Sequence, residues 1–246
     1  MCHRCDFMPG ITHSPQSRRG FLKIAAGLTL GMTLSARASA ADVKAPPKSQ
    51  NVVSPDAALK RLMEGNERYV KGVSRRHDFT HEREVLSKGQ NPFAAILSCA
   101  DSRIAPEYAF DTARGDLFVC RIAGNFASDE MVASLEYAAQ VVNTPLILVL
   151  GHGACGAVDA TIKSLKDNTT LPGHLPSLVA AIAPAVKASA DSSGNALDNA
   201  IRQNVILNVA KLQTVTPILS QFASEKKIRV VGGIYNLRSG NVDLVG

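Results

Sequence analysis

The chain has 246 residues, of which 46% are hydrophobic and 20% charged, a composition typical of a globular protein with a full core. The net charge of +6 comes mostly from residues 1–40, and the rest of the chain has 22 basic and 20 acidic side chains. So small an excess of charge, together with the absence of tryptophan, argues against nucleic acid as a partner.

The N-terminal residues have the features of an export signal. Residues 17–23 read Ser-Arg-Arg-Gly-Phe-Leu-Lys, and a paired arginine before an apolar stretch is typical of a twin-arginine signal. The apolar stretch at 24–34 is short for a membrane span, and residues 38–40 (Ala-Ser-Ala) offer a cleavage site. We expect residues 1–40 to direct the protein to the periplasm, or an equivalent extracytoplasmic space, and then to be removed, which leaves no stable membrane span. A chance basic and apolar segment, or an anchor that is retained, are the alternatives.

A polar linker and an amphipathic helix are expected next. Residues 41–53 are polar and contain proline, as linkers often do. Ser54 is a good N-cap, and Pro55 suits the first position of a helix. The apolar residues of 54–70 fall on one helical face, which predicts an N-terminal helical arm, and a shorter helical segment is expected at 80–88.

Apolar runs in the middle of the chain have the length of buried strands, at 93–98, 117–121 and 146–150. Between the last two runs, residues 129–142 carry apolar side chains at helical spacing. Strands that alternate with helices predict an α/β protein, with a central, mostly parallel sheet flanked by helices.

The C-terminal half is expected to be helical before it returns to the sheet. Residues 174–226 read as helix, and Pro184 and Pro217 are expected to break or bend it. Residues 228–235 then predict one more strand, and 242–245 a hairpin return beside it.

Two groups of sulfur and polar side chains each come directly after a predicted strand: 99–103 (Cys-Ala-Asp-Ser-Arg) and 152–155 (His-Gly-Ala-Cys). The carboxyl ends of parallel strands meet at one edge of a sheet, so the two groups should converge. A lone thiol or histidine at a strand end is more often structural, but two thiols and an imidazole together are typical zinc ligands. We therefore predict that Cys99, His152 and Cys155 hold one zinc ion, with a fourth position open for catalysis.

Asp101 is either the fourth ligand or a group beside the metal. Arg103 stands two residues further on, and a guanidinium can bind a carboxylate through two hydrogen bonds. Asp101 would be held off the metal while it is paired with Arg103 and could close the site when released. An ordinary salt bridge is the simpler alternative.

Residues 151–156 also fit the pattern G-x-G-x-x-G of dinucleotide-binding proteins. That fingerprint expects a second strand within about thirty residues, ending in an acidic residue that binds ribose. No strand is predicted before about residue 228, so crowding around the metal loop explains the glycines better.

The sequence resembles the β-class carbonic anhydrases from about Ser54 to the C-terminus, which makes residues 54–246 the catalytic domain. Cys99-x-Asp101-x-Arg103 and His152-x-x-Cys155 match that family's two zinc motifs in order and separation. The substrate-binding positions of the family fall, in this sequence, on Gln90, Phe118, Ala123 (where valine is common), Tyr137 and Gly156.

The resemblance implies a reversible hydration of carbon dioxide to bicarbonate and a proton by zinc-bound hydroxide, with one Zn²⁺ per subunit. It implies that Asp101 orients the hydroxide, that Arg103 keeps Asp101 ionised, and that Gln90 binds substrate oxygen. It also implies a homodimer or homotetramer. No histidine has a spacing that assigns it to proton transfer.

One departure from the family concerns closure of the site. Some bacterial members bind bicarbonate at a second pocket that uses a tryptophan and a glycine, where this chain has Ile96 and Ser98. We therefore expect the open form, with Asp101 off the metal.

Alternative functions are hydrolysis of carbonyl sulfide or carbon disulfide at the same zinc site, and a non-catalytic zinc protein of the same fold. Cys120 is interpreted as a buried strand residue. Cys2 and Cys5 would leave with the signal, so no disulfide framework is expected.

Overall fold

The structure is a computed structural model that describes residues 46–246. The predicted export signal, with Cys2 and Cys5, and the first residues of the predicted linker lie outside the described residues. Of the later linker residues, Lys48 is buried, and its Nζ lies 2.8 Å from Asp116 Oδ1. This ion pair fastens the chain to the domain before the first α-helix begins.

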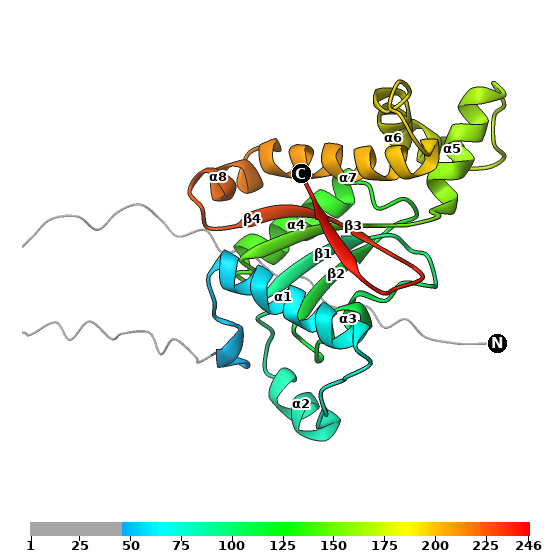
Figure 1. Cartoon of the computed structure of the whole chain (residues 1–246). Helices are drawn as coiled ribbons and strands as arrows, with labels where there is room; N and C mark the ends of the chain where they lie inside the picture. Colours follow the sequence, from blue (N-terminus) through cyan, green and yellow to red (C-terminus); the bar gives the residue numbers. More distant parts are fainter. Residues whose placement is uncertain (1–45) are drawn as a thin grey trace, which may run out of the picture. The chain divides into compact units, whose positions relative to one another are not determined.

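A five-stranded sheet forms the centre of the domain (Figure 1). Its strands, in the spatial order β2-β1-β3-β4-β5, are β2 (Leu117–Arg121), β1 (Ala94–Ser98), β3 (Leu146–His152), β4 (Arg229–Tyr235) and β5 (Val242–Val245). The first four are parallel, and β5 returns antiparallel to β4. The predicted α/β fold with a mostly parallel sheet and a final hairpin is therefore confirmed.

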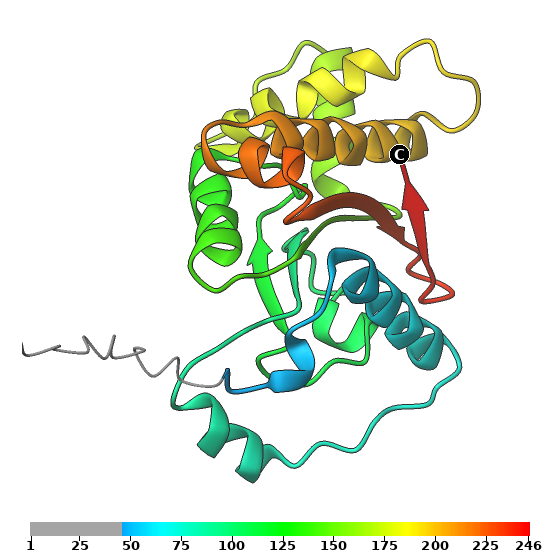
Figure 2. The same cartoon turned by 90° about the vertical axis from the view of Figure 1, so that its left-hand side faces the viewer.

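Helices cover both faces of the sheet, as the two views together show (Figures 1 and 2). The described helices are η1 (Ser49–Asn51), α1 (Pro55–Val70), α2 (Phe79–Leu86), α3 (Pro106–Ala109), α4 (Asp129–Gln140), α5 (Gly156–Lys166), α6 (Leu175–Ala188), α7 (Ala196–Thr214) and α8 (Ile218–Ser224). No helix in this part of the chain combines the length and the apolar character needed to cross a membrane.

Alternation along the strands creates two separate cores. On β1, Ala94 and Ile96 face α1 and α3, whereas Ala95 and Leu97 face α4, α7 and α8. Both faces are apolar because both are covered, as expected for a parallel sheet. Helices α5 and α6 pack in sequence onto α7, away from the sheet (Figure 1).

The N-terminus of α1 forms as predicted, since Ser54 Oγ accepts a hydrogen bond from the Ala57 N–H at 3.3 Å. In the helical region after residue 174, α6 continues through Pro184, so that of the predicted break or bend, a break does not occur there. Burial of the flanking Ile182 and Ala185 offsets the one hydrogen bond that proline removes. The chain leaves helical structure only after Ala188, and again beside Pro217, as predicted.

Candidate metal centre and active site

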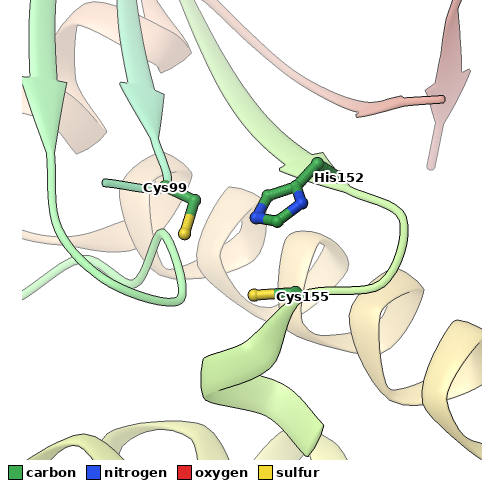
Figure 3. Close-up of side chains that lie close together, drawn as sticks. All are labelled: Cys99, His152 and Cys155. Carbon is green, nitrogen blue, oxygen red and sulfur yellow. The ribbon is translucent and has the colours of Figure 1, made fainter. Parts of the chain in front are cut away.

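Two neighbouring parallel strands bring the metal-binding motifs together. Ser98, the last residue of β1, pairs with Leu150 of β3, so Cys99 and His152 leave the sheet at the same edge. Cys155 is the N-cap residue of α5, one short turn beyond β3. The ligand atoms of Cys99, His152 and Cys155 all lie within 4.8 Å of one another, and all three side chains are buried (Figure 3).

The histidine is oriented as a metal ligand would be. His152 Nδ1 lies 2.9 Å from Gly153 O, and because a carbonyl oxygen only accepts, Nδ1 carries the proton. The other ring nitrogen, Nε2, is buried without a hydrogen-bond partner among residues 46–246 and points toward the two sulfurs (Figure 3). A buried nitrogen lone pair facing two thiols suits a tetrahedral zinc ion with one open position.

The two thiols are coupled. The hydrogen bond with Cys155 lowers the pKa of Cys99, and the backbone N–H of Gly124 acts in the same direction against the opposing effect of burial. Contact with Cys99 and burial raise the pKa of Cys155. Ionisation of Cys99 is thus favoured and that of Cys155 is opposed, so a positive charge such as a metal ion would be needed to hold both as thiolates.

Asp101 lies at the rim of this group and is held by Arg103. Arg103 Nε donates to Asp101 Oδ1 at 2.9 Å, and Nη2 donates to Oδ2 at 2.6 Å. These hydrogen bonds hold the pKa of Asp101 well below its usual range. Asp101 Oδ2 is 3.8 Å from His152 Nε2, yet Asp101 does not belong to the compact group of three ligands. The carboxylate of Asp101 is therefore held by Arg103 beside the position that a metal ion would occupy.

The family model described as carbonic anhydrase matches residues 94–242, which is more than half of the chain. This chain belongs to the β-carbonic anhydrase family. Carbonic anhydrase 2 of Mycobacterium tuberculosis is 38% identical over 192 residues, which cover 78% of this chain and 93% of that protein.

Solved structures agree on the fold. The β-carbonic anhydrase CcaA is 26% identical, has a TM-score of 0.57, and is similar over 76% of this chain and 98% of its own. A β-carbonic anhydrase from Sordaria macrospora, described as tetrameric, has a TM-score of 0.62 at 20% identity, over 77% of this chain and 98% of its own. At that identity, the second likeness shows the fold alone.

The dinucleotide alternative has no structural support. Between β3 and β4, the described residues form helices and loops without a strand. Gly151 is itself a strand residue, and a Cβ there would lie 2.7 Å from Val205 Cγ2. The glycine at 151 thus allows α7 to pack closely against β3 of this carbonic anhydrase fold.

Two residues beside the candidate metal-binding group of this carbonic anhydrase were not found from the sequence. Arg121, at the end of β2, donates to the carbonyl oxygens of Cys99, Asp101 and Ile104 at 3.0, 2.7 and 2.9 Å. The backbone N–H of Gly124 donates to Cys99 Sγ at 3.3 Å. For Arg121, the one signal in the sequence was an arginine at the end of an apolar strand. For Gly124, the sequence gave no signal.

The residues matched to the family's substrate pocket fall into two sets. Ala123 precedes Gly124, and Gly156 follows Cys155, so both are next to the metal group. Phe118 and Tyr137 lie together, with ring centroids 6.2 Å apart, and Phe118 pairs with Ala95 near the amino end of β1.

Gln90 also lies toward the amino end of β1, opposite the carboxyl end that carries Cys99. At about 3.3 Å per residue, β1 separates Phe93 from Cys99 by about 20 Å, and Gln90 precedes Phe93. The next residue, Asn91, is tied at 3.0 Å to the backbone of Lys48, which itself bonds Asp116 just before β2. Within one chain, therefore, Gln90 and the Phe118–Tyr137 pair are not brought to the metal group.

Proposed function

We propose that this protein is a zinc enzyme that reversibly hydrates carbon dioxide to bicarbonate and a proton. The observation that carries the proposal is the buried Cys99–His152–Cys155 group with an ionised Asp101 at its rim. Zinc held by these three ligands would lower the pKa of a bound water to about 7 and so supply hydroxide near neutral pH.

The residues around the metal position have distinct tasks in this proposal. Asp101 accepts a hydrogen bond from the O–H of the nucleophile, which turns an oxygen lone pair toward the carbon of carbon dioxide. Arg103 keeps Asp101 ionised and off the metal, and the bidentate pair at 2.9 and 2.6 Å supports an open resting state. Ala123 and Gly156 are small residues that leave room for the substrate beside the metal.

Assembly of subunits supplies the remaining substrate contacts. Because Gln90, Phe118 and Tyr137 lie away from their own chain's metal group, they can contact substrate only at the site of a second copy. A homodimer or homotetramer with shared sites fits this geometry. Mixing a Gln90→Ala chain with an Asp101→Asn chain tests the idea, since sharing should restore part of the activity in hybrid dimers. Hybrid dimers as inactive as both parents would contradict it.

Stopped-flow measurement of carbon dioxide hydration, with metal analysis of the same sample, tests the function. We expect one zinc per subunit and activity that a zinc-binding sulfonamide abolishes. The Asp101→Asn variant should keep its zinc and lose hydration, whereas Asp56→Asn, which alters an exposed carboxylate paired with Arg229, should be unaffected. A zinc-loaded protein that hydrolyses carbonyl sulfide or carbon disulfide but not carbon dioxide, or neither, would refute the proposal.

We also propose export through the twin-arginine route, which carries folded proteins and would let the metal be inserted beforehand. The support is the sequence of residues 17–40 alone. Replacing Arg18 and Arg19 with lysine should trap the protein in the cytoplasm, as measured by cell fractionation. Normal export of that variant would exclude the route.

A further inference from the structure

One backbone group outside the two metal-binding motifs donates a hydrogen bond to the sulfur of Cys99. The N–H of Gly124 donates to Cys99 Sγ at 3.3 Å and is buried with it. Hydrogen bonds from outer groups to metal ligands adjust the donor strength of those ligands and fix their orientation. The direction of this N–H is therefore relevant to the metal, and the loop that carries it needs a means of support.

Gly124 cannot keep that direction by itself. Its φ is +85°, a region that favours glycine, and a Cβ there would lie 2.5 Å from Ile182 Cδ1. Position 124 is thus restricted to the residue with the greatest backbone freedom. A glycine whose dihedral angles are free to change holds an N–H on a sulfur only if neighbouring groups fix the loop.

Helix α7 fixes the loop with a row of polar side chains. Asn204 Nδ2 donates to the carbonyl oxygen of Gly124 at 2.8 Å, and Asn208 Oδ1 accepts from the N–H of Ala127 at 2.7 Å. Asn208 Nδ2 in turn donates to Asn204 Oδ1 at 3.2 Å, which orients the Asn204 amide. Lys211 Nζ donates to the carbonyl oxygen of Ala127 and completes the row one turn further along the helix.

The position of Asn204 gives it a specific influence on the sulfur. Asn204 is 1% exposed, so water cannot replace its hydrogen bond to Gly124. The carbonyl that it holds and the N–H that contacts Cys99 lie on either side of the same Cα atom. Fixing the carbonyl fixes the ψ angle of Gly124, and the attachment of Ala127 to Asn208 closes the other end of the loop.

We propose that Asn204 is a positioning residue for the metal centre: through Gly124 it aims a backbone N–H at Cys99 Sγ and thereby limits how strongly that thiolate donates electrons to the metal. The inference rests on the proposed zinc site. Asn208 acts one step further away, by orienting the Asn204 amide.

The test uses the full chain loaded with Co²⁺, whose thiolate-to-metal charge-transfer band reports the donor strength of the cysteine ligands. Asn204→Asp keeps the shape and the acceptor for Asn208 but removes the donor to Gly124, and Asn204→Leu removes both. In each variant we expect the band to move to longer wavelength, because the Cys99 thiolate loses its hydrogen bond. Zinc affinity, measured against a chromophoric chelator, should fall about tenfold, because the sulfur also loses its fixed orientation.

The control is another buried asparagine that donates to backbone carbonyls. Asn66 is also 1% exposed, and its Nδ2 donates to Ala109 and Gly240 at 2.8 Å, on the α1 face of the sheet. Asn66→Asp should lower the melting temperature and leave the cobalt band unchanged. Two results would overturn the inference. In one, the bands and zinc affinities of both Asn204 variants stay at the wild-type values. In the other, they move equally in Asn66→Asp.

If neither Asn204 variant folds, Asn208→Leu takes their place. We expect a smaller shift of the cobalt band in that variant, and an unchanged band would count against the proposal. The wild-type protein separates this inference from the proposed function. Without a cobalt-thiolate band at one metal per chain, the metal site itself is refuted. With a normal wild-type band and unmoved variants, only the role of Asn204 fails.

Discussion

Both carboxylate oxygens of Asp101 accept hydrogen bonds from the guanidinium of Arg103. The same guanidinium donates to the carbonyl oxygen of Ala154, in the loop that carries the other two metal ligands, at 3.1 Å. Ala154 has a φ of +51°, a backbone conformation that side-chain-bearing residues rarely adopt. Arg103 therefore connects the segment that follows Cys99 to the loop between His152 and Cys155, and it also orients the carboxylate of Asp101.

Replacing Arg103 with glutamine should release Asp101. We expect zinc to be retained and kcat/KM for carbon dioxide hydration to fall about 10- to 100-fold, because the carboxylate loses its orientation and is free to occupy the open metal position. Stopped-flow kinetics with metal analysis measures both quantities. Arg229→Gln is the control, since Arg229 forms an exposed ion pair with Asp56 at 2.7 Å. Equal activity in the two variants would show that Arg103 has no part in catalysis.

Cys155→Ser should abolish metal retention, because serine is a poor zinc ligand and leaves only two of the three donors. Metal content per chain after dialysis against a chelator gives the answer. Cys120→Ala provides the comparison: Cys120 is also a buried free cysteine but lies on β2, outside the ligand group. Its zinc content should be normal, and loss of zinc from both variants would point to general unfolding instead.

Arg121→Ala should destabilise the fold. The substitution leaves three carbonyl oxygens, of Cys99, Asp101 and Ile104, without their guanidinium partner. Each hydrogen bond to a charged donor contributes about 1.5–3 kcal/mol, but water will satisfy some of these oxygens, so we expect a loss of about 2–4 kcal/mol in the free energy of unfolding. Urea denaturation measures it, and a change below about 0.5 kcal/mol would contradict this account.

Stability should fall at alkaline pH through Tyr235. Burial and the hydroxyl of Tyr69, 3.0 Å from that of Tyr235, raise the pKa of Tyr235 to about 12. An unfolded tyrosine has a pKa of about 10, so the contribution is fully present below pH 10 and is lost as the pH rises through 12. The full loss should be on the order of 2–3 kcal/mol.

The comparison with Tyr235→Phe isolates this contribution from other groups that titrate at alkaline pH. Phenylalanine cannot ionise, so between pH 9 and 11.5 the denaturation midpoint of the variant should decline less than that of the wild type. The two curves running parallel would mean that Tyr235 titrates normally in the folded protein.

Much of the fold could be predicted because its signals are local. The buried strands are short apolar runs, and Ser54 caps α1 through a contact three residues away. Local signals fail where tertiary packing determines the structure. Helix α6 continues through Pro184 because residues just before and just after the proline are buried. Helix α3 is too short to show a helical periodicity in the sequence.

The sequence by itself determined the ligand set. Cys99 follows one strand, His152 and Cys155 follow another, and parallel strands must release them at the same edge of the sheet. Only the tertiary structure decided what surrounds that set. Arg121 of β2 and Gly124 of the following loop contact Cys99, and Asn204 of α7 supports that loop from 80 residues away in sequence. The same packing separates Gln90 from the metal group by the length of β1, since a side chain before a strand and one after it lie at opposite ends of the sheet.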